Sequence, residues 1–375
     1  MEDMWIDCKL GDIVNFRRGH DLPHSEMTGG VIPVAGSNGI IGYHNVATPV
    51  SPCITIGRSG NVGTPYMYET AWAHNTTLYI DDFKGNDPLY VYYLLKTLPL
   101  SSFGGGSAVP TLNRNHIHPL IVHHCIDINE QKRIASVLKT LDDKIELNNR
   151  INHNLEEQAQ ALYKSWFVDF EPFKDGKFVD SELGMIPEGW HLGTLSEVAS
   201  VVMGQSPSGT SFNEEGRGIV FYQGRTEFGN RFPSVRLFTT EPTRFAEQFS
   251  VLLSVRAPVG DINVAKERCC IGRGLASIFG KFQSYVFYTV DSLRPAMDRY
   301  NGEGTVFGSI NRKDLENLQI IVPTSDAEEQ FNKIAEKLDA EIFDRSMENL
   351  QLKKLRDSLL PKLMSGELNI NEIGC

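Results

Sequence analysis

The 375-residue chain lacks the features of a secreted, disulfide-stabilised or membrane-spanning protein. Its six cysteines show no paired spacing, which predicts free thiols in a reducing compartment. No run of about 18 apolar residues occurs, and the N-terminal sequence MEDMWIDCKL is acidic and has no apolar core. We therefore expect no membrane span, no signal peptide and a cytoplasmic location.

The sequence also lacks the common signatures of catalysis. It contains no P-loop of the form G-x-x-x-x-G-K-[ST], no G-x-S-x-G, no H-E-x-x-H and no C-x-x-C. A glycine-rich run, SSFGGGS at 101–107, has no lysine behind it to bind a phosphate, so it predicts a turn or a ligand-facing loop. We therefore expect a protein that is not an enzyme and that needs no cofactor.

Four histidines and a cysteine lie in one short stretch of the sequence, which raises the hypothesis of a metal site. His116, His118, His123 and His124 precede Cys125. The first two flank an expected strand start, and the adjacent pair would project to opposite faces of a strand. We therefore predict no metal site in this stretch.

Charge is distributed unequally along the chain. The whole sequence has 36 basic and 47 acidic residues, and its net charge of −11 argues against a domain that binds nucleic acid alone. Residues 184–322 hold 14 Lys and Arg against 14 Asp and Glu, and 11 of those cations are Arg. Residues 1–128 hold 7 against 11 but carry 8 of the 10 histidines. The contrast suggests two modules that recognise different things.

The longest regular pattern is a heptad repeat within residues 129–168. Its apolar residues recur at alternating steps of four and three, which places them on one narrow stripe of a long helix. Such a stripe is typical of a coiled coil, and a helix pair inside a larger bundle is the alternative. Asn129 is the expected N-cap, with Glu130 in the first turn. The stripe consists of Ile134, Leu138, Leu141, Ile145, Asn148, Asn152, Leu155, Ala159, Leu162 and Trp166.

The same stripe recurs 197 residues later, which indicates an internal repeat. Phe331 stands where Ile134 stood, and Ile342 stands where Ile145 stood. The middle of both stripes is polar, and buried polar layers in a coiled coil fix register and partner orientation. These layers would face one another if the two helices pack antiparallel. The residues expected to set the register are Asn148, Asn152, Arg345 and Asn349.

A β-rich module precedes each long helix. In the first module, runs of β-forming residues separated by turn formers predict strands at 31–35, 53–57, 77–80 and 120–122, and PLYVYYLLK predicts a helix at 88–96.

Beyond a connector at 171–189, the second module repeats the first. Gly204 is matched with Gly19 at an offset of 185 residues, and Arg312 is matched with Arg114 at an offset of 198 residues. The drift in offset indicates insertions within the modules. We expect an α+β fold in which two β-rich domains are separated by two long antiparallel helices that form a coiled coil, with a pseudo-twofold internal repeat.

Arginine recurs in matched loops of the two modules and supplies the candidate binding chemistry. Arg58 is matched with Arg256, and Asn75 stands opposite Arg273. Arg can bond bidentately to guanine or hold a phosphate, and Asn can read adenine. A surface or salt-bridging role is the alternative for any one residue, but recurrence in both halves favours DNA recognition. The candidate DNA-binding residues are Arg17, Arg18, Arg58, Ser59, Asn75, Arg114, Arg225, Arg256, Arg273 and Arg312.

Four segments carry a resemblance to one protein family. They are NEQKRIA at 129–135, ALYKSWFVDF at 161–170, SELGMIPEGW at 181–190 and LLPKLMSGEL at 359–368. In this order, and over essentially the whole chain, they resemble the specificity (S) subunit of type I restriction–modification systems. The helix and linker segments are specific to that family, whereas glycine-rich loops alone are not.

The resemblance implies a function. In that family, two target recognition domains each read one half of a bipartite double-stranded DNA sequence, and the paired helices fix the spacer between the halves. Methyltransferase (modification) subunits dock on the helices, and a restriction–translocase subunit joins through them. The S subunit itself catalyses nothing, in agreement with the lack of an N-P-P-[YF] methyltransferase motif.

Two alternatives remain open from the sequence. One is a non-DNA scaffold, in which two β-rich modules bind proteins across a coiled-coil spacer; arginine in matched loops favours DNA. The other is a methylation-only complex without a restriction subunit. The expected segments are target recognition domain 1 at 1–128, spacer helix 1 at 129–172, a linker at 173–189, target recognition domain 2 at 190–324 and spacer helix 2 at 325–370.

Overall fold

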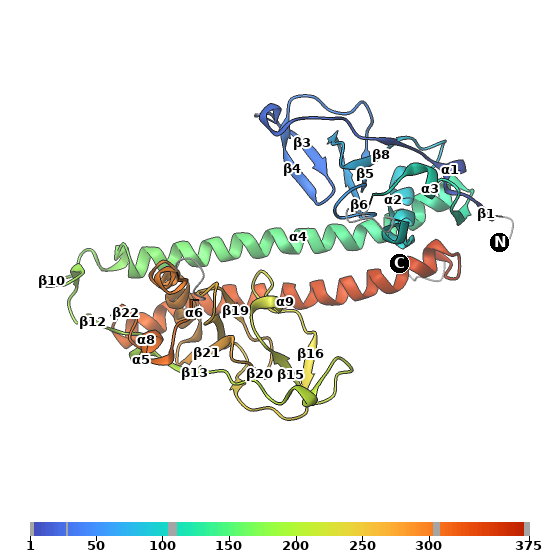
Figure 1. The fold of residues 1–375 in the computed structure, drawn as a ribbon. Helices are drawn as coiled ribbons and strands as arrows, with labels where there is room; N and C mark the ends of the chain where they lie inside the picture. The colour runs from blue at the N-terminus through green and yellow to red at the C-terminus, as the bar shows by residue number, and fades with distance from the viewer. Residues whose placement is uncertain (1–3, 28, 104–110, 303–307, 371–375) are drawn as a thin grey trace. The chain divides into compact units, whose positions relative to one another are not determined.

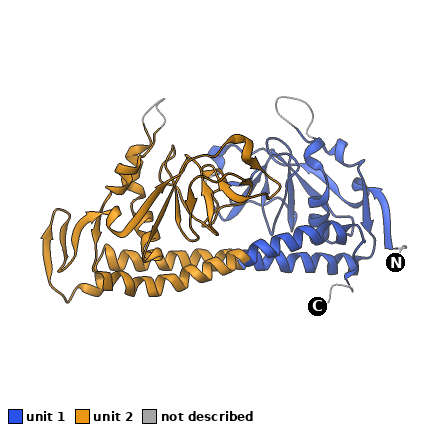
Figure 2. Ribbon diagram, turned by 90° about the horizontal axis from the view of Figure 1, so that it is seen from below, with its two compact units in different colours: residues 1–147, 348–375 blue, residues 148–347 orange. Residues whose placement is uncertain are grey.

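The computed structural model describes residues 4–27, 29–103, 111–302 and 308–370 (Figure 1). Two β-rich modules alternate along the chain with two helices of 40 residues each, α4 (Ile128–Phe167) and α9 (Ser325–Met364). The chain divides into two compact units, one of residues 1–147 and 348–375 and the other of residues 148–347 (Figure 2). Each long helix therefore contributes one part to each unit.

The first module is built on a four-stranded antiparallel sheet. Its strand order is β2 (Asn15–Arg18), β8 (Thr77–Asp82), β5 (Cys53–Gly57) and β6 (Pro65–Tyr68). A second sheet has the order β4 (Gly39–His44), β3 (Ile32–Gly36) and β7 (Trp72–Ala73), and β1 (Trp5–Lys9) pairs with β9 (Ile121–Cys125). The helices of this module are α1 (Leu10–Ile13), α2 (Pro88–Thr97) and α3 (Arg114–Ile117).

The second module has the same plan with additional strands. Its four-stranded sheet has the order β13 (Ala199–Met203), β21 (Leu275–Gly280), β18 (Val251–Ser254) and β19 (Ile262–Val264). A five-stranded sheet has the order β14 (Phe212–Asn213), β16 (Leu237–Thr239), β15 (Ile219–Tyr222), β20 (Cys269–Ile271) and β17 (Phe245–Ala246). The remaining elements are β12 (His191–Thr194) paired with β22 (Gln319–Val322), and helices α5 (Leu195–Val198), α6 (Gln283–Ser292), α7 (Arg294–Met297) and α8 (Arg312–Glu316).

The two modules agree in pairing direction as well as in strand order. Strand β3 pairs antiparallel with β4 and parallel with β7, and β15 pairs antiparallel with β16 and parallel with β20. The predicted internal repeat is confirmed, and β14 and β17 are the strands that the second module adds. The connector between the modules is more regular than expected, since β10 (Phe178–Ser181) and β11 (Gly184–Pro187) form a hairpin within it. Short 3-10 turns lie at His24–Glu26, Leu100–Phe103, Glu171–Phe173, Gly209–Ser211, Arg225–Glu227 and Asp298–Tyr300.

The two long helices pack antiparallel within each unit, as the heptad pattern predicts. In the second unit, Asn152 Nδ2 donates to the Ile342 carbonyl at 3.4 Å. In the first unit, Asn349 Nδ2 donates to the Ile145 carbonyl, also at 3.4 Å. Because the two donors and the two acceptors are each 197 residues apart, the same asparagine contact is made twice.

The start of α4 differs from the sequence-based prediction. The helix begins at Ile128, and Asp127 Oδ1 accepts hydrogen bonds from the amides of Asn129 at 2.8 Å and Glu130 at 3.4 Å. Asp127 therefore caps the helix, and the prediction of Asn129 as the N-cap is wrong. A carboxylate is favoured at this place because it accepts from free amides and lies at the positive end of the helix dipole.

Each module is attached to the helices by a buried apolar core and by polar contacts, of which one tyrosine contact recurs in both units. The Tyr93 hydroxyl on α2 donates to Asp142 of α4 at 2.8 Å, and the Tyr288 hydroxyl on α6 donates to Asp339 of α9 at 2.8 Å. The two aspartates are 197 residues apart. Burial is the largest cause of a raised pKa for both tyrosines, so both hydroxyls stay protonated and act as donors.

We predict that Tyr93→Phe lowers the free energy of unfolding by about 1 kcal/mol, because it removes one hydrogen bond to a carboxylate and leaves the ring in place. Urea unfolding measures the change. Tyr92→Phe is the matched control, since Tyr92 lies on the same helix and its hydroxyl has no hydrogen-bond partner among the described residues. Equal destabilisation by the two variants would contradict the assignment.

Candidate nucleic-acid interface

One end of the four-stranded sheet in the first module forms an exposed loop framework. The Gly19 amide, after β2, donates to the Thr77 carbonyl at 3.0 Å. The Arg58 amide, after β5, donates to the Thr76 carbonyl at 2.8 Å. These bonds hold three loops together, which we call the first-module edge: residues 18–21, 58–59 and 74–76.

The second module has the same framework. The Gly204 amide, after β13, donates to the Leu275 carbonyl at 2.9 Å, and the Val255 amide, after β18, donates to the Gly274 carbonyl at 3.0 Å. We call the loops that these bonds join the second-module edge: residues 203–206, 255–256 and 272–274.

A glycine is required at the same place in both frameworks. A Cβ atom on Gly19 would collide with the His74 carbonyl oxygen, and one on Gly204 would collide with the Gly272 carbonyl oxygen. Close approach of two backbones explains the recurrence of this glycine better than a left-handed conformation does, because neither residue has a positive φ.

The framework corrects one match made from the sequence. The Leu112 amide donates to the Arg58 carbonyl at 2.7 Å, whereas the equivalent Ile310 amide donates to the Val255 carbonyl at 3.1 Å. Arg58 is therefore equivalent to Val255, and the match of Arg58 with Arg256 is wrong by one residue. Ser59 occupies the position of Arg256, because Ser59 and Arg256 form the equivalent bridges of the two modules. In extended chain, a shift of one residue turns a side chain to the other face.

On the first-module edge, three of the candidate residues meet around one carboxylate. Asp21 accepts a hydrogen bond from the side-chain Nδ2 of Asn75 and one from the Arg18 guanidinium at 3.3 Å. The Arg58 guanidinium lies 3.5 Å from the Asn75 carbonyl oxygen. The hydrogen bond from Asn75 is the largest cause of a lowered pKa at Asp21, and the positive charges of Arg18 and Arg58 lower it further. Asp21 therefore stays ionised and holds these side chains together.

Two other candidates of the first module have partners outside this cluster. Arg17 forms an ion pair with Asp81 on β8. Arg114 begins α3 after the Asn113 N-cap, and its guanidinium donates to the Phe16 carbonyl at 3.4 Å.

In the second module, two candidates are paired and two are not. Arg225 forms an ion pair with Asp261, and Arg312 Nε lies 2.7 Å from Glu316. Arg256 and Arg273 are both exposed, and among the described residues neither guanidinium has a hydrogen-bond or ion-pair partner.

An aromatic cluster beside the first-module edge was not identified from the sequence. The His20 ring lies 5.2 Å from Trp72 and 5.5 Å from Tyr79, and the His44 ring lies 5.3 Å from Trp72. His20 also bridges to His74 through the backbone. The high histidine content of residues 1–128 is the one signal that pointed toward it.

The histidines considered for metal binding have other contacts. His116 lies within α3 and His118 ends it, so the prediction that they flank a strand start is wrong. His118 Nε2 accepts from the Phe16 amide at 3.1 Å, and burial lowers its pKa. His123 Nδ1 lies 2.8 Å from Asp7, while burial lowers the pKa of His124 to about 4.

Within the part of the chain that the structure describes, no cluster of three potential metal ligands occurs. In the same part, no helix is both long and apolar enough to cross a membrane. Four residues of the glycine-rich run at 101–107, those at 104–107, lie outside the described residues.

The polar layers predicted for the helix seam are present in the two units. Asn148 is fully buried and Asn349 is 5% exposed. Asn152 also donates to Ser346 Oγ at 3.1 Å, and Arg345 pairs with Glu341 on its own helix at 3.0 Å. The asparagines therefore bond across the helix pair, whereas the ion pair of Arg345 runs along α9.

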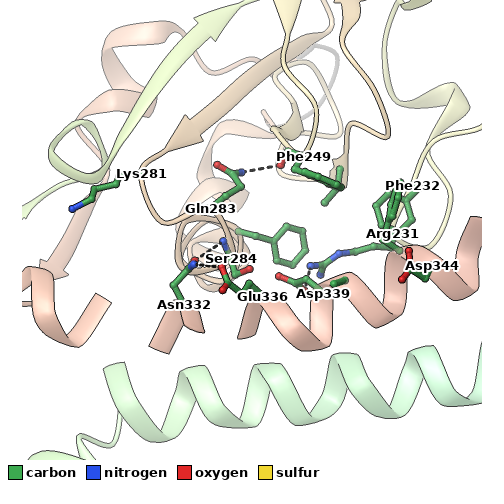
Figure 3. Close-up of a pocket in the computed structure, with 14 residues that line it drawn as sticks. Arg231, Phe232, Phe249, Lys281, Gln283, Ser284, Asn332, Glu336, Asp339 and Asp344 are labelled. Atoms are coloured by element: carbon green, nitrogen blue, oxygen red, sulfur yellow. Dashed lines mark hydrogen bonds and ion pairs between the residues drawn. The ribbon is translucent and has the colours of Figure 1, made fainter. Parts of the chain in front are cut away.

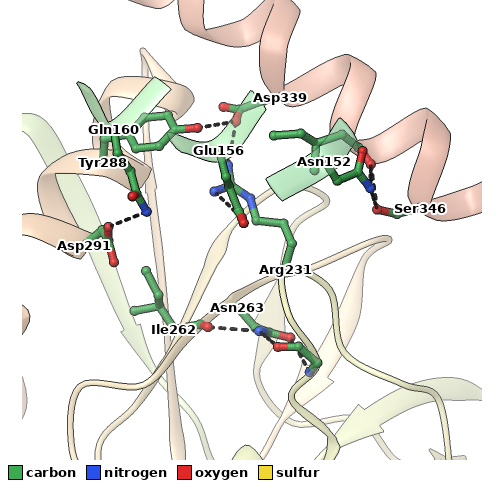
Figure 4. Close-up of polar contacts among 12 residues, drawn as sticks. Asn152, Glu156, Gln160, Arg231, Ile262, Asn263, Tyr288, Asp291, Asp339 and Ser346 are labelled. Carbon is green, nitrogen blue, oxygen red and sulfur yellow. Dashed lines mark hydrogen bonds and ion pairs between the residues drawn. The ribbon is translucent and has the colours of Figure 1, made fainter. Parts of the chain in front are cut away.

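The second unit contains a buried ion cluster that the sequence did not predict. Arg231 lies in the loop between β15 and β16, and its side chain is only 7% exposed. It pairs with Glu156 of α4 at 3.4 Å and with Asp339 of α9 at 2.6 Å (Figure 4). Its guanidinium also stacks on Phe287 of α6, 3.4 Å from the ring centroid. One arginine thus joins the module to both helices of this unit.

Beside this arginine lies a groove of about 500 Å³ between the second module and α9 (Figure 3). Phe232 and Phe249 come from the module, and Phe343 comes from α9. Both module rings meet Phe343 edge to face, at centroid distances of 5.5 and 5.2 Å. Asp344, also in the lining, is exposed at its margin. The lining offers apolar contact beside negative charge.

Comparison with known proteins gives one consistent result. The family model for the type I restriction modification DNA specificity domain matches residues 2–157 and 187–355. A putative specificity subunit of the type I restriction enzyme MjaX from Methanocaldococcus jannaschii is 32% identical over 294 residues, which are 76% of this chain and 69% of that protein. The specificity subunit of the type I restriction enzyme HindI from Haemophilus influenzae is 24% identical over 319 residues, 64% of this chain and 68% of that protein.

A solved structure has the same fold. The S subunit of a type I restriction–modification system from M. genitalium superposes with a TM-score of 0.67 at 17% identity, and the match covers 96% of each chain. The repeated, two-module chain on paired long helices is therefore a fold that this chain shares with that S subunit. This chain belongs to the type I restriction–modification DNA specificity family. At the level of the family, its function is recognition of DNA targets.

We predict that Arg231→Ala lowers the free energy of unfolding by about 3 kcal/mol, because it leaves the carboxylates of Glu156 and Asp339 without their shared cation. The control is Arg268→Ala, which removes an arginine from an exposed pair with Glu247 in the same module and should cost less than about 1 kcal/mol. Urea unfolding of both variants measures these changes. If Arg231→Ala lowers the free energy of unfolding no more than Arg268→Ala does, the stabilising role of the cluster is refuted.

The cluster also predicts a dependence of stability on pH. Burial is the largest cause of a raised pKa at the Glu156 carboxyl, although the charge of Arg231 lowers it. A raised pKa means that the folded chain favours the protonated form. The stabilisation is therefore complete below the ordinary pKa of glutamate and is lost as pH rises through the raised value.

We accordingly expect the unfolding free energy of the wild type, minus that of Glu156→Gln, to fall as pH rises from about 4 through the raised pKa of Glu156. Glu157→Gln is the matched control, because it removes one carboxylate from an exposed position next to Glu156 on the same helix. A difference for Glu156→Gln that does not change with pH would show that this carboxyl does not titrate differently in the folded chain.

Proposed function

We propose that this chain is the sequence-reading subunit of a type I restriction–modification complex, with each module reading one half of a bipartite double-stranded DNA target. The observation that carries the proposal is the pair of edges. One hydrogen-bonded framework, built by equivalent strand ends, presents different polar side chains in the two modules. A DNA target with two different halves requires two recognition domains whose exposed side chains differ, even where their backbones are equivalent.

The recognition domains in this proposal are residues 1–128 and 190–324. The first helical segment, 129–172, and a linker at 173–189 lie between them in the chain. The ten candidate residues that we infer to contact DNA lie on or next to the edges or at the starts of α3 and α8. Most of their guanidinium groups are paired with carboxylates or carbonyls, so DNA would have to compete for them. This pairing is compatible with contacts to DNA phosphates, because a phosphate contact depends on the positive charge and does not require one fixed side-chain geometry.

The helical segments 129–172 and 325–370 are the ruler of the complex in this proposal. A helix of 40 residues is about 60 Å long, enough to bridge half-sites about one helical turn apart. The antiparallel asparagine contacts support a fixed register, because a slip of either helix would leave buried amides without their acceptors.

The helices are also where we place the methyltransferase subunits, through which a restriction–translocase subunit would join. Several large apolar side chains of the helices are 40% exposed or more, a surface that a partner would cover. In this proposal the chain performs no chemistry of its own, and its partners supply much of the phosphate contact that an acidic chain lacks. The exposed apolar residues are Leu147, Ile334, Leu350 and Leu355.

The test is adenine methylation across the genome of a methylation-free host. Expression of this chain together with its methyltransferase subunit should produce methylation at one bipartite motif with a fixed gap. The motif should disappear when this chain is omitted. A stable complex that methylates no such motif would refute the proposal and favour a protein-binding scaffold.

We predict that insertion of four residues after Asn148 together with four after Arg345, the matched position of the other helix, lengthens the gap in the motif by about one or two base pairs. Four helical residues add about 6 Å, and a base pair spans about 3.4 Å. Both half-sites should keep their sequence, because neither edge is altered.

The control for this insertion is a four-residue insertion in the hairpin of the linker, between Ser181 and Gly184, where neither long helix is lengthened. It should leave the gap unchanged. Methylation by the doubly inserted chain at the original spacing and at full rate would refute the ruler.

A further inference from the structure

Of the eight candidate arginines, six hold a partner with the guanidinium group and two do not. The pairs of Arg17, Arg18, Arg225 and Arg312 are with carboxylates, and those of Arg58 and Arg114 are with carbonyls. The two without a partner among the described residues, Arg256 and Arg273, both lie on the second-module edge.

The backbone that carries Arg273 is fixed on both sides. The Gly272 amide donates to the Tyr222 carbonyl at 2.8 Å, and the Gly274 amide donates to the Gln223 carbonyl at 3.3 Å. The Arg273 amide itself donates to Ser206 Oγ at 3.3 Å. A Cβ at Gly274 would lie 2.8 Å from the Gln223 carbonyl oxygen, so the loop is packed as closely as glycine allows.

The backbone that carries Arg256 is fixed in the same way. It bridges to Ser309, and the Ala257 amide donates to the Gly308 carbonyl at 3.0 Å. The neighbouring Val255 amide donates to the carbonyl of Gly274, next to Arg273. Two guanidinium groups that have no partner among the described residues therefore lie on adjoining loops of the second-module edge.

The equivalent positions of the first module carry no cation. Ser59 occupies the place of Arg256 in the bridge, and Asn75 occupies the place of Arg273, since the Thr76 and Gly274 carbonyls accept equivalent bonds. The nearby Arg18 and Arg58 are held around Asp21 and Asn75. The two edges thus share a backbone and differ in the charge that they can offer to DNA.

A guanidinium on a fixed backbone, with no carboxylate paired to it among the described residues, has the properties that base recognition needs. Guanine presents two acceptors, N7 and O6, in the major groove, and bidentate arginine is their commonest partner. A phosphate contact would tolerate a mobile or a paired arginine, whereas base reading requires the position of the side chain to be set in advance.

We infer that Arg256 and Arg273 read guanine in the half-site of the second module, and that the first module reads its half-site without a guanidinium at the matched positions. The inference rests on the proposed function, because it assigns a base to one of the two readers proposed above. It adds the chemical identity of the half-site that this edge accepts.

The experiment uses the complex of this chain with its methyltransferase subunit and duplexes that contain the methylated motif. Each guanine of the second half-site is replaced in turn by 7-deazaguanine, which keeps base pairing and removes the N7 acceptor. We expect one or more replacements to weaken wild-type binding about 10- to 100-fold. Arg273→Asn or Arg256→Asn should weaken binding to the unmodified duplex by a similar factor and be insensitive to the same replacement.

Arg268→Asn is the matched control, because it removes the same charge from the other end of β20. It should keep the wild-type affinity and sensitivity. Replacements in the first half-site should weaken the wild type and Arg273→Asn equally, and equal thermal unfolding midpoints should show that the variants are folded.

A failure of the proposed function and a failure of this inference give different results in the binding experiment. A wild-type complex that binds no bipartite duplex refutes the proposed function itself. Specific wild-type binding with a second half-site that lacks guanine, or with both variants still sensitive to every replacement, refutes only the inference. Weaker binding of the variants with a smaller salt dependence and unchanged base preference identifies phosphate contacts, and also refutes it.

Discussion

Antiparallel packing of α4 and α9 is the constraint on which each unit depends. Each module is attached to the helix surface by apolar packing and by polar contacts, among which a tyrosine that donates to a helix aspartate occurs in both units. The place of a module therefore follows from the register of the helix pair. Asn152 and Asn349 set that register, since a slip of either helix would move their side-chain amides away from the carbonyls of the opposite helix that accept from them.

The repeat keeps this attachment and changes how its charge is balanced. In the first unit, Asp142 accepts from Tyr93 and pairs with Arg356 of α9 at 2.6 Å, and Lys96 of the module lies farther away, at 3.8 Å, with its side chain 26% exposed. In the second unit, the equivalent Asp339 accepts from Tyr288 and pairs with Arg231, which comes from the module. The second module is therefore bound to its helices by an additional buried ion cluster. The loop that supplies it leads to β16, in the sheet that the second module enlarges.

Periodicity and repetition predicted the parts of the structure that local sequence determines. The heptad stripe predicted both long helices and a coiled coil, and antiparallel packing was the arrangement in which their polar layers would face one another. The recurrence of Gly19 as Gly204 was part of the evidence for the repeated module. The cluster around Arg231 was not predictable, because it joins residues 75 and 108 positions apart that show no pattern. The match of Arg58 with Arg256 failed because residue identity was compared, whereas backbone hydrogen bonds define equivalence.

The division between framework and surface would allow one fold to serve the two different half-sites of the proposed function. The edge backbones are fixed by amide–carbonyl bonds and by glycines at points of close approach, and none of these depends on the exposed side chains. Side chains such as Asn75 and Arg273 can therefore differ without cost to the fold, and they differ in charge. Because the chain carries a net negative charge, two guanidinium groups without a partner among the described residues would add more to DNA binding on this edge than they would in a basic protein. In the proposed function, recognition by the two modules is therefore unequal in its chemistry, although their backbones are equivalent.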